Sequence, residues 1–343
     1  RRLIMWLQTT WFVLYVIIVS GYVILDGFDL GVGMLSPFIA HNDHDRRILL
    51  NSIGPVWDGN EVWLVLGGGA LFAAFPIVYA SLFSGFYLAM MLVLLVLIMR
   101  TVAIEFRSKR PEAWWRSLWD WTFTISSFGI TILLGVALGN VIRGVSLDQR
   151  GNLNVSLLDL LNPYSIALGL VAVTMLCLHG SIFLTLKTEG ELLVTIKALI
   201  PKLLIAFFSL MTALILWTLL RDEQFTQNFK DRPWTAIFPL LAFVSIAAAW
   251  LFVRRGAYLS AFLASATMIA LLIGAIACGM YPVMLRSTTN SAYDLTVQNA
   301  SAAKETLAVM FVIALIGMPL VLLYTAGVYY FFRGKVELDD DSY

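Results

Sequence analysis

The feature that most constrains this fold is a series of apolar runs, each about 20 residues long, which is the length of helix that crosses a bilayer core of about 30 Å. Only 13% of the 343 residues are charged, whereas a soluble domain carries about 25%. The runs do not alternate between apolar and polar residues as strands of a membrane barrel do. We therefore predict an all-α fold: a polytopic integral membrane protein.

Nine runs can be distinguished, so we predict nine transmembrane helices within a single domain that covers residues 1–343. Pro76 and residues 81–85 are interpreted as a very tight turn between the second run and the third. The predicted spans are 8–33, 57–79, 81–104, 118–141, 163–186, 196–220, 234–253, 258–283 and 306–332.

Lys and Arg residues predict the orientation. The larger share of the 23 lies in the loops on the side of the C-terminus, notably in the segment "EFRSKRPEAWWRSLWDW". Because short cytoplasmic loops are enriched in Lys and Arg, we predict an N-terminus outside the membrane and a C-terminus in the cytoplasm. A net charge of +1 gives no reason to expect a nucleic-acid partner.

Acidic residues stand where apolar runs end or begin. Asp26 and Asp29 close the first run, and Asp58 and Glu61 open the second. Both pairs have the i, i+3 spacing that places two side chains on one helix face. An acid at the membrane centre costs about 2.5–3.5 kcal/mol on insertion scales, so such residues often serve a function. With the predicted orientation the four acids lie toward the cytoplasmic leaflet, which suggests a proton entry path.

A structural interpretation of these acids stays open. Asp26 and Asp29 could satisfy backbone amides at a helix end, and Asp58 could cap the second span. Arg100 and Glu105, near the inner end of the third span, are interpreted as a structural ion pair.

His179 is the only histidine inside a predicted span. It could be one axial ligand of a haem, but a buried histidine bonded to a neighbouring helix is the preferred interpretation. His41 and His44 are interpreted as part of a solvated loop, and Cys177 and Cys278 as small buried side chains. No metal site is predicted.

Two glycine groups are interpreted as places where helices approach closely. The first comprises Gly27, Gly31 and Gly33, and the second is the run Gly67–Gly69. The second group resembles a phosphate-binding loop in composition only, since it lies inside a predicted span.

Several of these segments resemble subunit II of the cytochrome bd quinol oxidases. They are "LDGFDLGVGML", "NDHDRRILLNSIGPVWDGNEVWLVLGGGALFAAFPIVYASLFSGFY", "FRSKRPEAWWRSLWDW" and "LLNPYSIALGLVAVTML". The likeness runs from about Trp11 to the last span. It implies two four-helix bundles plus one peripheral helix, in the cytoplasmic (inner) membrane of a bacterium.

The resemblance also implies a function. The family's complex oxidises quinol and reduces O2 to water, and its haems b and d are held by a partner, subunit I. Subunit II would be a haem-free scaffold, inactive alone, and the complex would build a proton gradient without pumping. Small single-span accessory subunits and a structural quinone are further implied partners, although no residues here can be assigned to the quinone.

The resemblance assigns the family's cytoplasmic proton path to Asp58, Trp63 and Glu105, with Asp26 or Asp29 as further members. Some relatives carry Asp at the position of Glu105, so this side chain keeps the carboxyl group but reaches further. The alternative from a different class is a secondary transporter, which would need acids near the midplane in two related halves of the chain. No counterpart of these acids is seen in the second half.

Overall fold

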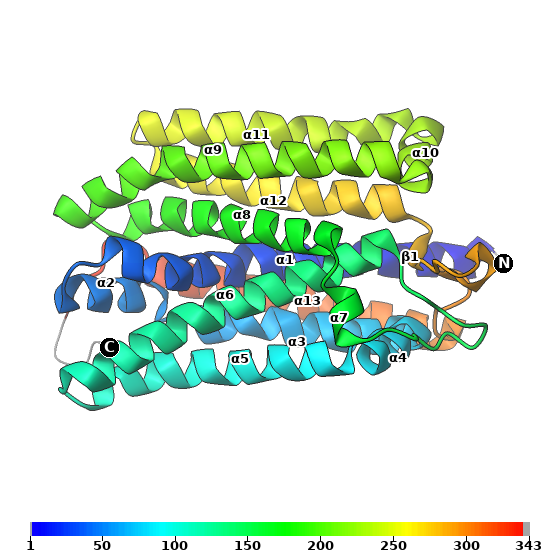
Figure 1. Cartoon of the computed structure of the whole chain (residues 1–343), viewed down its shortest axis with the longest axis horizontal. Coiled ribbons are helices and arrows are strands. Elements are labelled where there is room, and N and C mark those ends of the chain that lie inside the picture. The colour runs from blue at the N-terminus through cyan, green and yellow to red at the C-terminus, as the bar shows by residue number, and fades with distance from the viewer. Residues whose placement is uncertain (1, 339–343) are drawn as a thin grey trace.

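The computed structural model describes residues 2–338, except for the side chains of residues 2, 3 and 224. Nine long helices run nearly parallel along its long axis (Figure 1). They are α1 (Arg2–Ile39), α3 (Trp57–Ala74), α5 (Tyr87–Phe106), α6 (Ala113–Arg143), α8 (Pro163–Lys187), α9 (Gly190–Arg221), α11 (Ile237–Arg254), α12 (Tyr258–Met280) and α13 (Lys304–Phe331).

Short elements connect the long helices at the two ends of the bundle. They are α2 (Asp43–Ile53), α4 (Pro76–Gly85), α7 (Leu157–Leu160), α10 (Glu223–Asp231), three 3-10 turns (Arg107–Lys109, Pro233–Ala236 and Ser291–Tyr293) and an antiparallel pair, β1 (Val283–Leu285) with β2 (Leu295–Thr296). We call the end that carries α2 the α2 end; the N-terminus lies at the opposite end (Figure 1).

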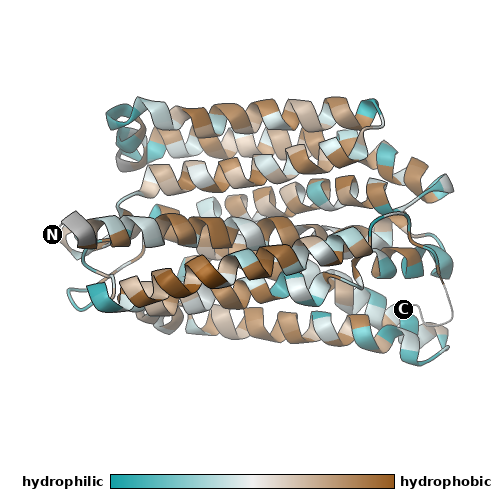
Figure 2. Ribbon diagram, turned by 180° about the vertical axis from the view of Figure 1, so that it is seen from behind, coloured by the Kyte–Doolittle hydropathy of each residue, from teal (hydrophilic) through white to brown (hydrophobic). Residues whose placement is uncertain are grey.

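Eight of the described helices are long and apolar enough to cross a membrane, and α3 is not among them. Its 18 residues include Asp58, Glu61 and three consecutive glycines. The all-helical membrane fold is therefore confirmed, whereas the count of nine spans stays a prediction. Figure 2 shows the same pattern, with apolar residues along the helices and polar residues gathered at the two ends.

The boundary between the second and third predicted spans was placed wrongly. The predicted break at residues 81–85 lies inside α4, and the second span ends at Ala74 instead of residue 79. Pro76 explains the earlier end, because proline has no backbone N–H and its ring clashes with the preceding helical turn. Pro76 instead starts α4, so a ten-residue apolar helix takes the place of the predicted tight turn.

The helices form two groups. Helices α1, α3, α5 and α6 lie together on one side, and α8, α9, α11 and α12 lie together on the other, joined by contacts of α8 with α1 and α6 (Figure 1). Helix α13 belongs to neither group, and its main contacts among the described residues are with α1 and α3. The arrangement matches the predicted two four-helix bundles and peripheral helix.

The two groups meet at a close crossing of α1 with α8. Gly31 faces the backbone of Leu176 and Gly180, and a Cβ at Gly180 would lie 2.8 Å from Gly31. The predicted close-contact role is confirmed for this group. The run Gly67–Gly69 behaves differently, since Gly68 and Gly69 have no neighbour within 4 Å of a Cβ position in the described part of the chain. The close helix contact predicted for this run stays a prediction.

The C-terminal segment is fastened to the end of α8. The Lys335 amine donates to the backbone oxygens of Thr185 and Thr188, at 2.9 and 2.7 Å. The Val336 amide donates to the Lys187 oxygen at 3.0 Å. A cation placed on the last carbonyls of a helix satisfies groups that have no partner inside it. This contact brings the end of α13 against the α2 end of α8.

Candidate functional site: a buried polar cluster at the α2 end

Asp26 and Asp29 lie in the middle of a continuous helix. Helix α1 runs through this region to Ile39, so neither acid stands at a helix end and the capping interpretation is wrong for both. Each is 0% exposed, and their i, i+3 spacing does place them on one buried face. A fully buried carboxylate is costly unless it is paired or hydrogen-bonded, so their partners decide what each can do.

Asp26 is paired with Arg100. The guanidinium, which is also 0% exposed, donates from Nη1 to Oδ2 at 3.0 Å and from Nη2 to Oδ1 at 2.6 Å. This two-bond geometry is the strongest form of carboxylate recognition. The predicted partner of Arg100 was Glu105, and that pairing is wrong: Arg100 lies on the face of α5 that packs inward, where the α1 acid is within reach.

Asp29 has no cation bound to it. Its Oδ2 accepts a hydrogen bond of 2.8 Å from Asn60 Nδ2 on α3. Asn60 is held in turn by Tyr329 on α13, whose hydroxyl donates to Asn60 Oδ1 at 2.8 Å. The second oxygen of Asp29, Oδ1, is buried without a hydrogen-bond partner. The sequence does not distinguish the two acids of α1, but their partners differ: Asp26 binds a cation with both oxygens, whereas Asp29 accepts one hydrogen bond from a neutral amide.

Asn60 and Tyr329 were not predicted as site residues. Asn60 sits between Asp58 and Glu61, and its polarity within an otherwise apolar region was an available signal. Tyr329 lies 269 residues from Asn60 in the chain, and nothing in its neighbourhood distinguishes it from other tyrosines near span ends.

Asp58 and Glu61 are neighbours on the surface of α3, as their i, i+3 spacing predicts, but they differ in burial. Asp58 is exposed in the isolated chain, and it forms no hydrogen bond or ion pair with other described residues; Glu61 is half-buried. Glu61 is near enough to Arg100 and Asp26 to interact with them electrostatically. Asp58 is not the N-cap predicted in the structural interpretation, because that position belongs to Val56. The pair therefore extends from the helix surface toward the buried cluster.

Trp63 points inward. Its side chain is 6% exposed and packs against α1 with Ile18 and Tyr22. A Cβ on Gly21 would lie 2.5 Å from the Trp63 ring, so the glycine makes room for the indole. Trp63 is close to the cluster along α3, but it lies behind the face that carries Asp58.

Glu105 is half-buried in the last turn of α5. The next polar residues along the chain belong to a second network, the rim cluster, at the surface of the α2 end. Arg107 donates to Asp120 at 2.5 Å and to Asp43 at 2.8 Å, Arg46 donates to Asp120 at 2.7 Å, and Arg116 donates to Asp43 at 2.8 Å.

The rim cluster binds its acids with arginines. Partial burial acts to raise the pKa of Asp43, but the hydrogen bond from Arg107 and the charges of Arg107 and Arg116 outweigh it, so the pKa lies below its usual value. Each rim acid is held by two arginines. Such a network fixes α2 against the end of α5 and the start of α6.

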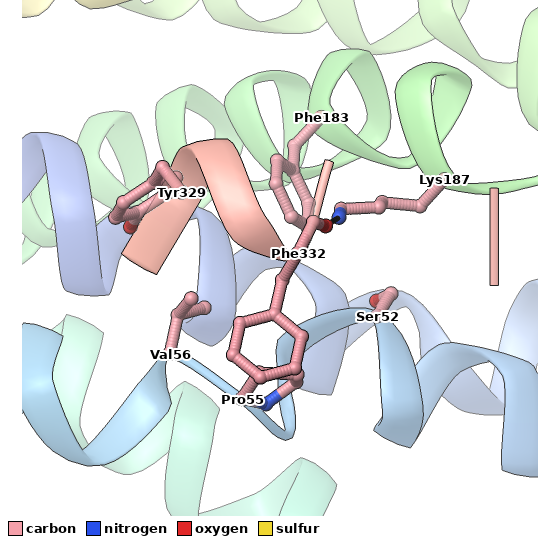
Figure 3. Close-up of a pocket in the computed structure, with 7 residues that line it drawn as sticks. All are labelled: Ser52, Pro55, Val56, Phe183, Lys187, Tyr329 and Phe332. Carbon is pink, nitrogen blue, oxygen red and sulfur yellow. Dashed lines mark hydrogen bonds between the residues drawn. The ribbon is translucent and has the colours of Figure 1, made fainter. Parts of the chain in front are cut away.

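A small cavity lies near the α2 end, where the segment after α2 meets α8 and the end of α13 (Figure 3). Its volume is about 20 Å³, enough for about one water molecule. The Lys187 amine borders it and donates to the Phe332 oxygen at 2.5 Å. The residues that line it are Ser52, Pro55, Val56, Phe183, Lys187, Tyr329 and Phe332. Tyr329 therefore touches both the cavity and, through Asn60, the buried carboxyl of Asp29.

His179 is a buried structural histidine, as the preferred interpretation held. Its Nε2 donates to the Ile24 oxygen at 3.0 Å, and its Nδ1 bonds to the Ser265 hydroxyl at 2.8 Å. Both ring nitrogens are therefore occupied. Cys177 and Cys278 are free thiols. Among residues 2–338, no group of three or more His, Cys, Asp or Glu side chains is placed to hold a metal ion.

Comparison with known proteins decides what this bundle is. The family described as cytochrome bd terminal oxidase subunit II matches residues 7–332. The chain belongs to this family. Its fold also matches a chain in the structure of the bd oxidase from Geobacillus thermodenitrificans, with a TM-score of 0.80 and 18% identity over 95% of this chain and 98% of that one.

Two curated relatives support the assignment to the bd oxidase subunit II family. The chain is 38% identical over 332 residues to the cytochrome bd ubiquinol oxidase subunit 2 of Bacillus subtilis, covering 96% of this chain and 97% of the relative. It is 35% identical over 364 residues to the cytochrome bd-I ubiquinol oxidase subunit 2 of Escherichia coli, covering 97% and 96%. The resemblance is thereby confirmed: this is a multi-pass membrane subunit of a bacterial respiratory oxidase, and the transporter alternative is set aside.

Membership in the bd oxidase family implies haem in the complex and a partner subunit I. The histidines described here do not fit a haem ligand, since His179 has no free ring nitrogen and His41 and His44 are exposed at the α2 end. Two cavities of the described chain have volumes of about 20 Å³ each, and neither is large enough to enclose a structural quinone. Its location stays unassigned.

Proposed function

We propose that this chain is the haem-free scaffold of the oxidase and carries protons from the cytoplasm toward the haem-bearing subunit I. The α2 end and the C-terminus face the cytoplasm, and the N-terminus faces outside. Quinol is oxidised on subunit I, so the chain has no activity alone. Protons from quinol leave on the outside and protons for water come from the inside, which builds a gradient without pumping.

One observation carries this proposal: α3 places a carboxyl group on an outward face that is otherwise apolar. Asp58 is exposed, and Val62, Val65, Leu66 and Phe72 on the same helix are also exposed. A carboxylate facing lipid is costly, whereas a partner with polar groups or bound water would stabilise it. Subunit I is the partner whose chemistry requires protons at that place.

Two further features of α3 support the proposal that the face carrying Asp58 contacts subunit I. Gly68 and Gly69 have no neighbour within 4 Å of a Cβ position in the described chain, and small residues allow another helix to come close. Glu61, on the inner side of α3, is placed to connect Asp58 with the buried cluster. Small single-span accessory subunits would occupy other lipid-facing surfaces, for which no residues are proposed.

The replacement Asp58→Asn tests the path. It removes the titrating group and keeps the size of the side chain, so we expect normal assembly and haem content but quinol oxidase turnover lower by about tenfold or more. A positioned proton-transfer group contributes a factor of about 10²–10⁴, and water can replace part of it. Turnover and proton uptake would be measured in proteoliposomes.

Glu112→Gln is the matched control for Asp58→Asn. Glu112 is exposed at the same end of the bundle and its side chain caps no helix, so turnover should stay at the level of the unchanged complex. Normal turnover and haem content in Asp58→Asn would leave Asp58 with a structural role only.

His179→Ala tests the haem-free assignment. Because both ring nitrogens bond to protein groups, the variant should lose stability by about 2–4 kcal/mol, as expected for a truncated buried side chain with lost hydrogen bonds. No haem absorption band of the purified complex should disappear. Loss of one band, with the others retained in proportion, would show instead that this chain ligates a haem.

A further inference from the structure

We infer that Asp29 holds an exchangeable proton, positioned by Asn60 and Tyr329, while Asp26 is the fixed counter-charge of Arg100. The inference deepens the proposed proton path by separating the two acids of α1, which the sequence and the family resemblance leave equivalent. The use of this proton in turnover rests on the proposed function, whereas its place on Asp29 is argued from hydrogen-bond geometry.

Asp26 is a poor place for a proton. Both of its oxygens accept hydrogen bonds from the Arg100 guanidinium, at 3.0 and 2.6 Å. Adding a proton to either oxygen would remove the negative charge that both N–H donors bind and leave a fully buried cation without its counter-charge. Arginine does not give up its own proton in proteins, so the pair stays ionic.

Asp29 accepts a proton without displacing anything. Its only hydrogen bond comes from the neutral Asn60 amide to Oδ2, and its Oδ1 is buried and has no partner. A proton on Oδ1 removes a buried negative charge that no cation contacts, which is the larger part of the burial cost. The free oxygen is therefore the position where a proton binds and from which it leaves.

The charges around Asp29 agree with this assignment. Among the described residues, Arg100 on α5 is the cation that acts on Asp29, and Asp26 on α1 already binds both of that cation's terminal nitrogens. The other titratable neighbours that act on the cluster are Glu61 on α3 and Tyr329 on α13. Neither supplies a positive charge, so the charge of an ionised Asp29 has no cation of its own to balance it unless a proton is bound.

The remaining elements around α1 do not change that balance. Tyr22, one turn before Asp26, is a neutral phenol. His179 on α8 uses its ring nitrogens for Ile24 and Ser265. Asp120 on α6 lies in the rim cluster and is held by Arg46 and Arg107.

Asn60 and Tyr329 act as positioning residues. The Tyr329 hydroxyl donates to Asn60 Oδ1, which turns the amide so that its NH2 group faces Asp29. An amide does not relay protons, so these two residues hold the carboxyl in place and the proton passes by way of Oδ1. Tyr329 also lines the water-sized cavity. Replacing Tyr329 therefore changes the hydrogen bonding around Asp29 and leaves the carboxyl group itself in place.

Infrared spectroscopy of the purified complex tests the inference directly. A protonated buried carboxyl gives a C=O stretching band that shifts when H2O is replaced by D2O. We expect one such band to vanish in Asp29→Asn and to persist in Asp58→Asn. We expect Tyr329→Phe to shift its frequency, because the hydrogen bond that orients Asn60 is lost while size is kept. A role confined to packing would leave the frequency unchanged.

Two results would overturn the assignment: an unaltered carboxylic-acid region in assembled Asp29→Asn, or no frequency shift in Tyr329→Phe. If Asp29→Asn does not assemble, Tyr329→Phe decides alone. The band reports the proton on Asp29 and not turnover. Normal turnover in Asp58→Asn with the band present would therefore reject the path through Asp58 and keep the proton on Asp29. Low turnover in Asp58→Asn, together with an unaltered carboxylic-acid region in Asp29→Asn, would keep the path through Asp58 and reject the proton on Asp29.

Discussion

Replacing Arg100 with methionine is expected to prevent recovery of an assembled oxidase. Arg100 and both α1 acids are 0% exposed, and the variant leaves Asp26 without the cation that binds both of its oxygens. Breaking a buried ion pair by removing one partner costs about 3–5 kcal/mol. The measurement is the amount of haem-bearing complex that co-purifies with this chain when it carries an affinity tag and is extracted in mild detergent.

A double variant shows whether the yield of the Arg100 variant falls because a buried charge is left unpaired or because side-chain volume is lost. Replacing a buried ion pair by apolar residues of similar size is often neutral or stabilising, so Asp26→Leu combined with Arg100→Met should restore much of the yield. Arg116→Ala, which affects only a partly exposed pair of the rim cluster, should cost less than about 1 kcal/mol. Normal yield of the single Arg100 variant would show that the pair contributes little to the stability of the subunit.

Gly31→Val is expected to separate the two helix groups. A Cβ at this position would meet the carbonyl group of Leu176 and the Cα of Gly180, and backbone atoms cannot rotate away as side chains can. Overpacking typically costs about 1–3 kcal/mol, and here we expect the upper end of that range or more. The thermal stability of the purified complex would report the loss.

Gly317→Ala is the matched control, since nothing lies within 4 Å of a Cβ there in the described part of the chain. Alanine also favours a helix over glycine by about 1 kcal/mol, so this variant should be as stable as the unchanged complex. Equal stability of the Gly31 and Gly317 variants would contradict a close α1–α8 crossing.

The family resemblance pointed to residues that lie together in the structure, but it did not distinguish the buried residues among them from the exposed ones. Asp58, Trp63, Glu105, Asp26 and Asp29 all belong to the α2 half of the first helix group. Their surroundings differ: Asp58 is exposed, Trp63 packs inward, and the α1 acids are buried. The role of each in the path stays a prediction, because exposure and partners indicate what a group can do and not what it does during turnover.

Some of the wrong predictions can be explained by residues nearby in the sequence, and others cannot. Pro76 ended α3 early and started α4, a rule that the sequence already contained. The pairing of Arg100 was missed because Glu105 is near in sequence, whereas its partner Asp26 lies 74 residues away. Spacing along one helix gives information about that helix only, so it could not reveal which residue of another helix would face it.

The sequence by itself determined that this is a bundle of membrane helices with acids near one end, because apolar length and the cost of a charge in hydrocarbon are properties of each segment alone. Only the tertiary structure decided that Asp26 binds Arg100 while Asp29 keeps a free oxygen. That difference depends on which side chains of α3, α5 and α13 reach α1, and helix packing brings them there from as far away as Tyr329.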